Sequence, residues 1–154
     1  MKFRIIFLIL LIFGTNNFVY SNDIVIESDI LEIYDNERKS IFKGSVYAKD
    51  EKLEVWSQEM VLKFFDESNK IKHIYANSNV TIFDGKITAT GENAIYDLSG
   101  KIVKMTGNIH VKEGGNILTC DELTLDLEKS TSIMKSNTLN KVRAVIINNN
   151  LVLE

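Results

Sequence analysis

Apolar and polar residues alternate along most of this chain, and one version of the alternation occurs three times between Phe42 and Leu127. The middle copy places apolar side chains at Val80, Ile82, Ala89, Ala94 and Tyr96. Apolar residues recur 29 positions later at Ile109, Val111, Leu118, Leu123 and Leu125, and 34 positions earlier at Val46, Ala48, Val55, Met60 and Leu62. Such a repeat is typical of stacked units that bury their apolar faces against their neighbours.

The two-residue period predicts β-strands rather than helices. We expect a first strand from Ile24 to Ile33, a polar turn at 35–38, and a second strand from Ser40 to Ala48. The pattern fades after Leu127, where 129–132 is polar. A last strand is predicted from Val142 to Ile147.

The inward face switches between odd and even positions in the middle of each repeat. Val55 and Ser57 continue an odd-numbered set, whereas Met60 and Leu62 are even-numbered. One residue too many in a two-residue period predicts a β-bulge or corner near 57–59. The change recurs near Gly91 and Cys120, and small residues share a midstrand position at Gly44, Ser78 and Gly107. We therefore predict an all-β, jellyroll-like slab in which bent hairpins stack into two facing sheets.

Length and composition are those of one globular domain. The chain has 154 residues, of which 45% are hydrophobic and 25% charged, and it contains no proline. The lack of proline suits a chain made of ladder-forming strands. We expect a domain over 22–154 whose Asn-rich tail, 148–154, is frayed.

Residues 1–21 have the pattern of a secretory signal peptide. A short basic start precedes an apolar run from Ile5 to Phe13, and cleavage is predicted between Ser21 and Asn22. The run spans roughly 14 Å as a helix, about half the hydrocarbon thickness of a bilayer. Cleavage is therefore favoured over retention as a membrane anchor, which stays open as an alternative.

Charge and reactive residues exclude several classes of function. The net charge of −3 becomes −5 when Lys2 and Arg4 are removed with residues 1–21, which argues against binding to nucleic acid. Cys120 is the single cysteine, and its small repeat equivalents indicate a buried filler. His73 and His110 fall on the outward face, outside any metal-binding motif. No group supports catalysis, so we predict no enzyme activity, no metal and no cofactor.

Three segments together resemble the OstA-like (LptA-like) family of lipopolysaccharide-transport proteins. They are Ile26-Glu27-Ser28-Asp29, Phe42-Lys43-Gly44-Ser45-Val46, and the later echo Met105-Thr106-Gly107-Asn108-Ile109. The resemblance extends over about 24–135. It implies a slightly open, twisted β-jellyroll in the periplasm of a Gram-negative bacterium, without enzymatic activity or cofactor.

The resemblance also implies a hydrophobic groove for the acyl chains of lipid A. The inward positions that would line it are Val46, Ala48, Val55, Met60, Leu62, Ile74, Ala76, Val80, Ile82, Ile87, Ala89, Ala94, Tyr96, Val103, Met105, Ile109, Val111, Leu118, Leu123 and Leu125. They mix bulky with small side chains, which leaves room for a guest. The residues by themselves favour a dry core, and the resemblance favours the groove.

Family members dock end to end through their terminal strands. The residues expected to form these strands are Ile24, Val25, Ile26, Ile30, Leu31, Ile33, Val142, Val145 and Ile147. The implied partners are lipopolysaccharide, an inner-membrane LptC-like protein, an outer-membrane LptD-like translocon and further copies of this chain in head-to-tail order. Two alternatives stay open, a membrane-anchored LptC-like subunit of the same pathway and a structural β-solenoid without a lipid ligand.

Overall fold

The computed structural model describes residues 23–137 and 139–147. The predicted signal peptide, its cleavage site at Ser21 and Asn22, and the Asn-rich tail lie outside these residues. Within the described residues all regular structure is β-strand apart from one short 3₁₀ turn, η1 (Asp35–Glu37), and there is no α-helix. None of the described segments is a helix long and apolar enough to cross a membrane. The all-β prediction is confirmed.

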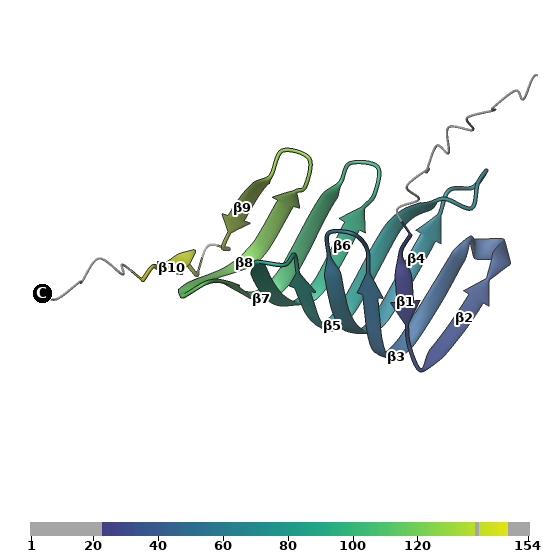
Figure 1. The fold of residues 1–154 in the computed structure, drawn as a ribbon, viewed down its shortest axis with the longest axis horizontal. Coiled ribbons are helices and arrows are strands. Elements are labelled where there is room, and N and C mark those ends of the chain that lie inside the picture. The colour runs from purple at the N-terminus through teal and green to yellow at the C-terminus, as the bar shows by residue number, and fades with distance from the viewer. Residues whose placement is uncertain (1–22, 138, 148–154) are drawn as a thin grey trace, which may run out of the picture.

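The strands form one antiparallel sheet that folds over on itself (Figure 1). They are β1 (Val25–Glu27), β2 (Ile30–Tyr34), β3 (Lys39–Lys49), β4 (Glu54–Phe64), β5 (Ile71–Phe83), β6 (Ile87–Asp97), β7 (Ile102–Glu113), β8 (Asn116–Asp126), β9 (Thr131–Lys135) and β10 (Arg143–Val145). Consecutive strands from β2 to β9 pair with each other, β1 pairs with β3, and β10 pairs with β8.

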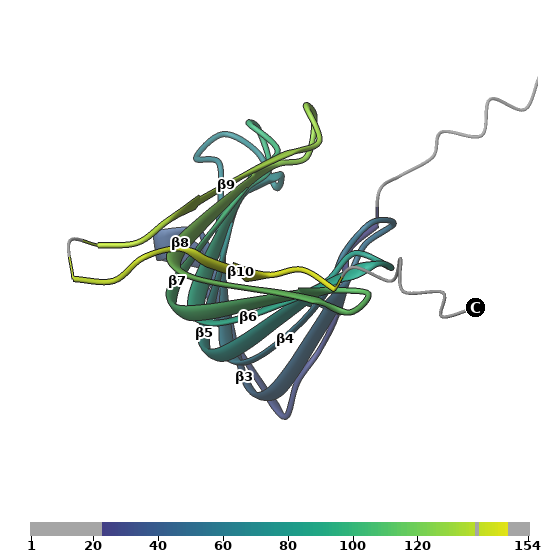
Figure 2. The same cartoon turned by 90° about the vertical axis from the view of Figure 1, so that its left-hand side faces the viewer.

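Each long strand bends in the middle, so its two halves lie in two facing layers (Figure 2). The first layer contains β2, β9 and segments 39–43, 59–64, 71–77, 93–97, 102–106 and 122–126. The second layer contains β1, β10 and segments 46–49, 54–57, 80–83, 87–91, 109–113 and 116–120. The predicted pair of sheets is thus one sheet, continuous through the bends, and the layers open like a V opposite them.

The bends arise where the sequence predicted them. The ladder register shifts between Lys43 and Val46, and comparable shifts occur on every later strand pair up to β7–β8. Strands β3, β5 and β7 each place two consecutive residues at positive φ there: Gly44 and Ser45, Ser78 and Asn79, Gly107 and Asn108. These left-handed residues turn the strand without changing which face its side chains occupy, whereas the inward set of β4, β6 and β8 switches between odd and even positions.

Four hairpin turns at the open edges contain an aspartate whose carboxylate accepts backbone N–H groups of the same turn. The carboxylate of Asp50 accepts the backbone N–H groups of Lys52 and Leu53, both at 2.7 Å. Asp84, Asp97 and Asp126 accept N–H groups two and three residues ahead in the same way. Such turns fix strand length and register because the side chain satisfies backbone donors that the ladder leaves free.

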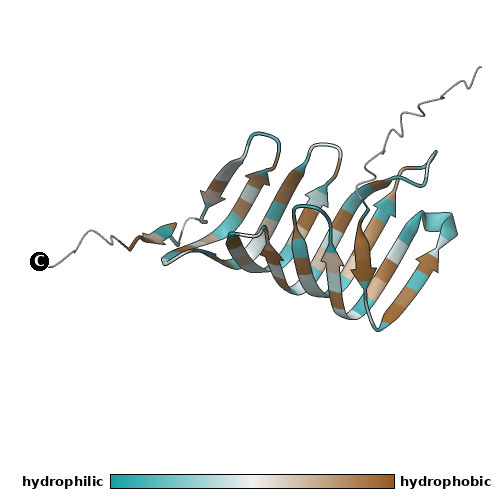
Figure 3. Cartoon of the chain, in the orientation of Figure 1, coloured by the Kyte–Doolittle hydropathy of each residue, from teal (hydrophilic) through white to brown (hydrophobic). Residues whose placement is uncertain are grey.

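The core lies between the layers, and apolar positions alternate with polar ones along each strand (Figure 3). The least exposed large side chains are Met60, Met105, Ile109, Leu123 and the valines at 46, 80 and 103. Burial of these side chains contributes about 1.5–3 kcal/mol each to folding. Cys120 is buried among them, as predicted.

Two predicted strands need correction, and one observed strand was not predicted. The first strand does not run unbroken from Ile24 to Ile33, because Ser28 and Asp29 separate β1 from β2. The break follows from the bend in β3: the edge strand must bend with it, and Asp29 donates its N–H to the carbonyl of Gly44 at 3.1 Å. The last strand is limited to β10 rather than Val142 to Ile147, and β9 was not expected.

Gly107 is expected to be a sensitive position in the fold. Its φ is +86°, and a Cβ atom there would lie 2.6 Å from the Glu92 side chain. Gly107→Ala should lower the free energy of unfolding by about 1–3 kcal/mol through backbone strain and steric overlap. Gly85→Ala is the matched control, since Gly85 also has positive φ but open space around it. Urea unfolding of both variants would measure the difference. An equal decrease in the free energy of unfolding in both would show that steric overlap with Glu92 contributes nothing.

Candidate functional site

Inward side chains form rows that run across the whole sheet. In the first layer, the row near the open edge passes through Ile33, Ser40, Leu62, Ile74, Tyr96, Val103, Leu125 and Ser132. The facing row of the second layer passes through Ile26, Ala48, Val55, Ile82, Ala89, Val111, Leu118 and Ala144. The two rows form an apolar interior that extends from β1 and β2, the head end, to β9 and β10, the tail end.

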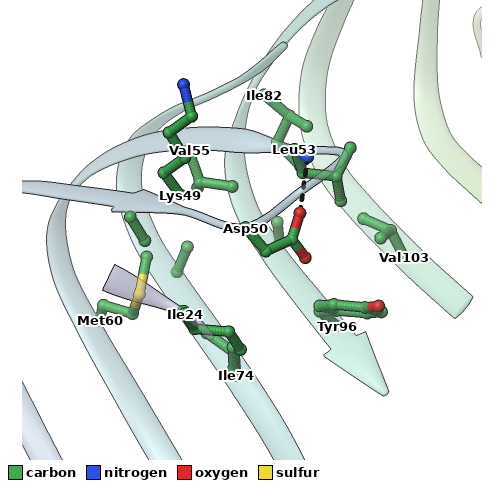
Figure 4. Close-up of a pocket in the computed structure, with 13 residues that line it drawn as sticks. Ile24, Lys49, Asp50, Leu53, Val55, Met60, Ile74, Ile82, Tyr96 and Val103 are labelled. Atoms are coloured by element: carbon green, nitrogen blue, oxygen red, sulfur yellow. Dashed lines mark hydrogen bonds between the residues drawn. The ribbon is translucent and has the colours of Figure 1, made fainter. Parts of the chain in front are cut away.

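An apolar pocket opens between the layers near the β3–β4 turn (Figure 4). Its lining residues are Ile24, Ala48, Lys49, Asp50, Leu53, Val55, Met60, Ile74, Ala76, Ile82, Ala94, Tyr96 and Val103. Three alanines from different strands create the space. The volume is about 40 Å³, a few water sites at roughly 10–15 Å³ each. A longer hydrocarbon chain would therefore enter only if side chains at the opening moved apart.

A second, more polar pocket adjoins the first on its outer side and shares Ile24, Asp50 and Tyr96 with it. Its volume is about 210 Å³. Its lining includes Glu51 and Lys52 of the β3–β4 turn, Leu98 and Lys101 of the β6–β7 turn, and Leu127, which follows β8. The entrance therefore combines charged and apolar side chains, whereas the deeper pocket is almost wholly apolar.

Tyr96 and Asp50 mark the boundary between the two pockets. Burial raises the pKa of the Tyr96 phenol, and the negative charges of Asp50 and Asp97 raise it further. The phenol is therefore neutral at physiological pH. Asp50 is held in place by the N–H groups of its own turn, one of which belongs to Leu53, a buried residue that covers the pocket. These groups suit the rim of an apolar cavity and include no base positioned for catalysis.

The described residues contain no group of three or more His, Cys, Asp or Glu side chains that could hold a metal ion. His110 is exposed, and His73 is half-buried beside Tyr75, with ring centroids 6.0 Å apart. Burial raises the pKa of the Cys120 thiol, with a further contribution from Asp121. A buried thiol with a raised pKa is a poor nucleophile. The interior is suited to apolar contacts rather than to bond making.

Comparison with known proteins identifies the family. Residues 25–131 match the family described as LptA/(LptD N-terminal domain) LPS transport protein. The chain belongs to this family. A similar solved structure is that of LptH from Pseudomonas aeruginosa, described as the LptA homologous periplasmic component of the conserved lipopolysaccharide transport device. The two chains are 13% identical, with a TM-score of 0.73 over 82% of this chain and 96% of LptH, so this likeness concerns the fold. No curated protein matches the sequence significantly.

All twenty side chains predicted to line the groove of this LptA-family chain face the interior. They belong to the buried core or pack directly against it. Nine of the thirteen residues that line the apolar pocket are among them: Ala48, Val55, Met60, Ile74, Ala76, Ile82, Ala94, Tyr96 and Val103. A tenth lining residue, Ile24, comes from the predicted docking strands. The remaining lining residues, Lys49, Asp50 and Leu53, form the β3–β4 turn. The alternation could have assigned Leu53 to the groove, because this residue belongs to the odd-numbered apolar set before the bulge.

The predicted docking residues lie at the two ends of the sheet. Ile24 and Ile26 are half-buried against the core, whereas Leu31 is 50% and Ile33 65% exposed although both face inward. Val25, Ile30, Val142, Val145 and Ile147 are also exposed. At the head end, the inward rows of this family member thus end in apolar side chains, Ile26 and Ile33, that no further strand covers within the described residues.

Proposed function

We propose that this LptA-family chain is a periplasmic carrier that shields the acyl chains of lipopolysaccharide between its two layers. The observation that supports this most strongly is the pair of facing inward rows, which extend from the head end to the tail end and enclose an apolar pocket. Its work is binding and transfer rather than catalysis. Residues 1–21 would direct the chain to the periplasm and be removed there.

The energetics favour acyl chains as the recognised part of the ligand. Burial of each methylene contributes about 0.8 kcal/mol, so ten methylenes offset roughly 8 kcal/mol of the cost of leaving a membrane. The small pocket volume implies that the ligand separates the layers at their open edge, opposite the bends that connect them. The bends on the opposite side keep the two layers connected while the open edge widens.

The two ends of the sheet support end-to-end docking. Both strands of the head end, β1 and β2, run antiparallel to β3, and both strands of the tail end, β9 and β10, run antiparallel to β8. Strands alternate in direction from β3 to β8, so β9 and β10 run opposite to β2 and β1. A second sheet placed head to tail would continue an antiparallel ladder in both layers at once.

We propose partners on this basis. An LptC-like inner-membrane protein would deliver lipid at the head end, and an LptD-like translocon would receive it at the tail end. Further copies of this chain could extend the sheet between them. Apolar side chains exposed at the head end, such as Leu31 and Ile33, would then become interior residues of a continuous groove.

A photo-crosslinking amino acid at Ile82 is expected to capture lipopolysaccharide in cells. Ile82 is buried and lines the apolar pocket, whereas the next residue, Phe83, lies on the outer face of the same strand. The crosslinker at Phe83 is therefore the matched control and should yield little or no adduct. Adducts would be detected with an antibody to lipopolysaccharide. Equal capture at both positions would contradict the carrier proposal, and so would capture at neither when both variants fold.

A further inference from the structure

A third pocket lies at the head end of the first layer, at the open edge. It is formed by Ile33, Tyr34, Asp35, Arg38, Lys39, Ser40, Phe64 and Asn69, and its volume is about 180 Å³. These residues belong to the β2–β3 hairpin, to the end of β4 and to the β4–β5 turn. The pocket therefore stands where, under the proposed function, lipid would arrive from a docked donor.

Arg38 is the central charged group of this pocket. One terminal nitrogen of its guanidinium, Nη2, donates to the carbonyl oxygens of Phe65, at 3.1 Å, and Ser68, and approaches Oδ1 of Asn69 at 3.4 Å. These bonds tie the guanidinium to the β4–β5 turn and fix its position. Its Nε atom is buried and has no hydrogen-bond partner among the residues that the structure describes. A buried guanidinium N–H without an acceptor is costly, and an anion or water commonly supplies one.

The other charges near the pocket are largely balanced. The ammonium of Lys39 forms an ion pair with Glu37 at 2.5 Å and lies 4.7 Å from the centre of the Tyr34 ring. Asp35 is a carboxylate in the lining, but it is exposed at the turn. Arg38 is thus the cation whose donor has no partner, and guanidinium N–H groups match the geometry of phosphate and carboxylate oxygens.

Apolar residues connect this pocket to the interior. Ile33 and Ser40 are the first two members of the inward row that continues through Leu62, Ile74 and Tyr96 to Val103. The last four of these residues pack in or against the core, and three line the apolar pocket. A ligand with an anionic group at Arg38 could therefore lay a hydrocarbon chain along this row.

We infer that the Arg38 pocket binds the phosphate or carboxylate head of an anionic amphiphile whose chain enters between the layers. The inference rests on the proposed carrier function and deepens it. The oxyanion accepts the N–H of Arg38 Nε, and the chain contacts Ile33 and Phe64 on its way inward. The head end thereby selects anionic lipids, although the chain as a whole is acidic.

Titration with decyl phosphate, followed by the NMR resonance of the Arg38 Nε–H group, tests the inference directly. The ligand is kept below its micelle concentration, and decyl maltoside and inorganic phosphate are titrated in parallel. We expect decyl phosphate alone to shift the resonance in a saturable way. Arg38→Lys keeps the positive charge but removes the planar guanidinium and its Nε–H donor. It should weaken decyl phosphate binding about ten-fold. Lys70→Gln is the charge control, because Lys70 is exposed and outside the pocket lining.

Every outcome has a defined meaning. An equal response to inorganic phosphate would show a site for free anions and overturn the amphiphile assignment. No response to either phosphate would leave hydration only and overturn the site. If Arg38→Lys fails to fold, the response of the Arg38 Nε–H resonance to decyl phosphate in the unmodified protein still tests the inference. If the crosslinker at Ile82 captures lipopolysaccharide but decyl phosphate does not shift the Arg38 Nε–H resonance, this inference is refuted and the carrier proposal stands. If the crosslinker at Ile82 captures no lipopolysaccharide, the carrier proposal is refuted.

Discussion

Ile30→Pro is expected to weaken binding to the LptC-like partner at least about ten-fold while the fold is retained. Asp29 donates to the carbonyl of Gly44, and hydrogen-bonded and non-hydrogen-bonded pairs alternate in an antiparallel ladder. Ile30, the next residue, therefore directs its N–H away from β3, toward the free edge. Proline there removes a donor that an incoming strand needs, and its ring obstructs close pairing.

Ile30→Val is the matched control, because it keeps the N–H and a β-branched side chain. Binding would be measured by biolayer interferometry with immobilised partner, and circular dichroism would confirm that both variants keep their strands. Unchanged affinity for Ile30→Pro would show that the β2 edge is not the contact. A loss of structure in Ile30→Pro would show that the Ile30 N–H belongs to the internal ladder instead.

Ala94→Phe is expected to reduce capture of lipopolysaccharide more than ten-fold. Ala94 is buried in the first layer and lines the apolar pocket with Ala48 and Ala76. A benzyl group in its place would occupy the space that a hydrocarbon chain needs. The same change should cost about 1–3 kcal/mol of folding free energy by overpacking, unless the layers open to admit the ring.

Ile95→Phe provides the comparison for this second variant. Ile95 is the adjacent residue on β6, lies on the outer face and is partly exposed, so a larger side chain there leaves the interior unchanged. Capture by the crosslinker at Ile82 would be quantified in both backgrounds, together with urea unfolding. Undiminished capture in a folded Ala94→Phe protein would show that lipid does not use this pocket.

Much of the fold and of the interior could be predicted because a period of two residues assigns each side chain to one face of a strand. The groove positions follow directly from that assignment, and the bulges follow from the change in parity after Ser57, Gly91 and Cys120. The β9 strand escaped notice because Thr131 and Ser132 are polar and only Met134 packs inward. A strand at the end of a sheet has little to bury, so its pattern is weak.

Local spacing thus determined the all-β fold, the three bent repeats and the inward rows. Only the tertiary structure determined that the two predicted sheets are one, that the first strand breaks at Asp29, and that Arg38 reaches a neighbouring turn with an unpartnered nitrogen. The reason is physical: alternation records the face on which a residue lies, whereas the contacts of turns and edges depend on segments about 30 residues apart in the chain.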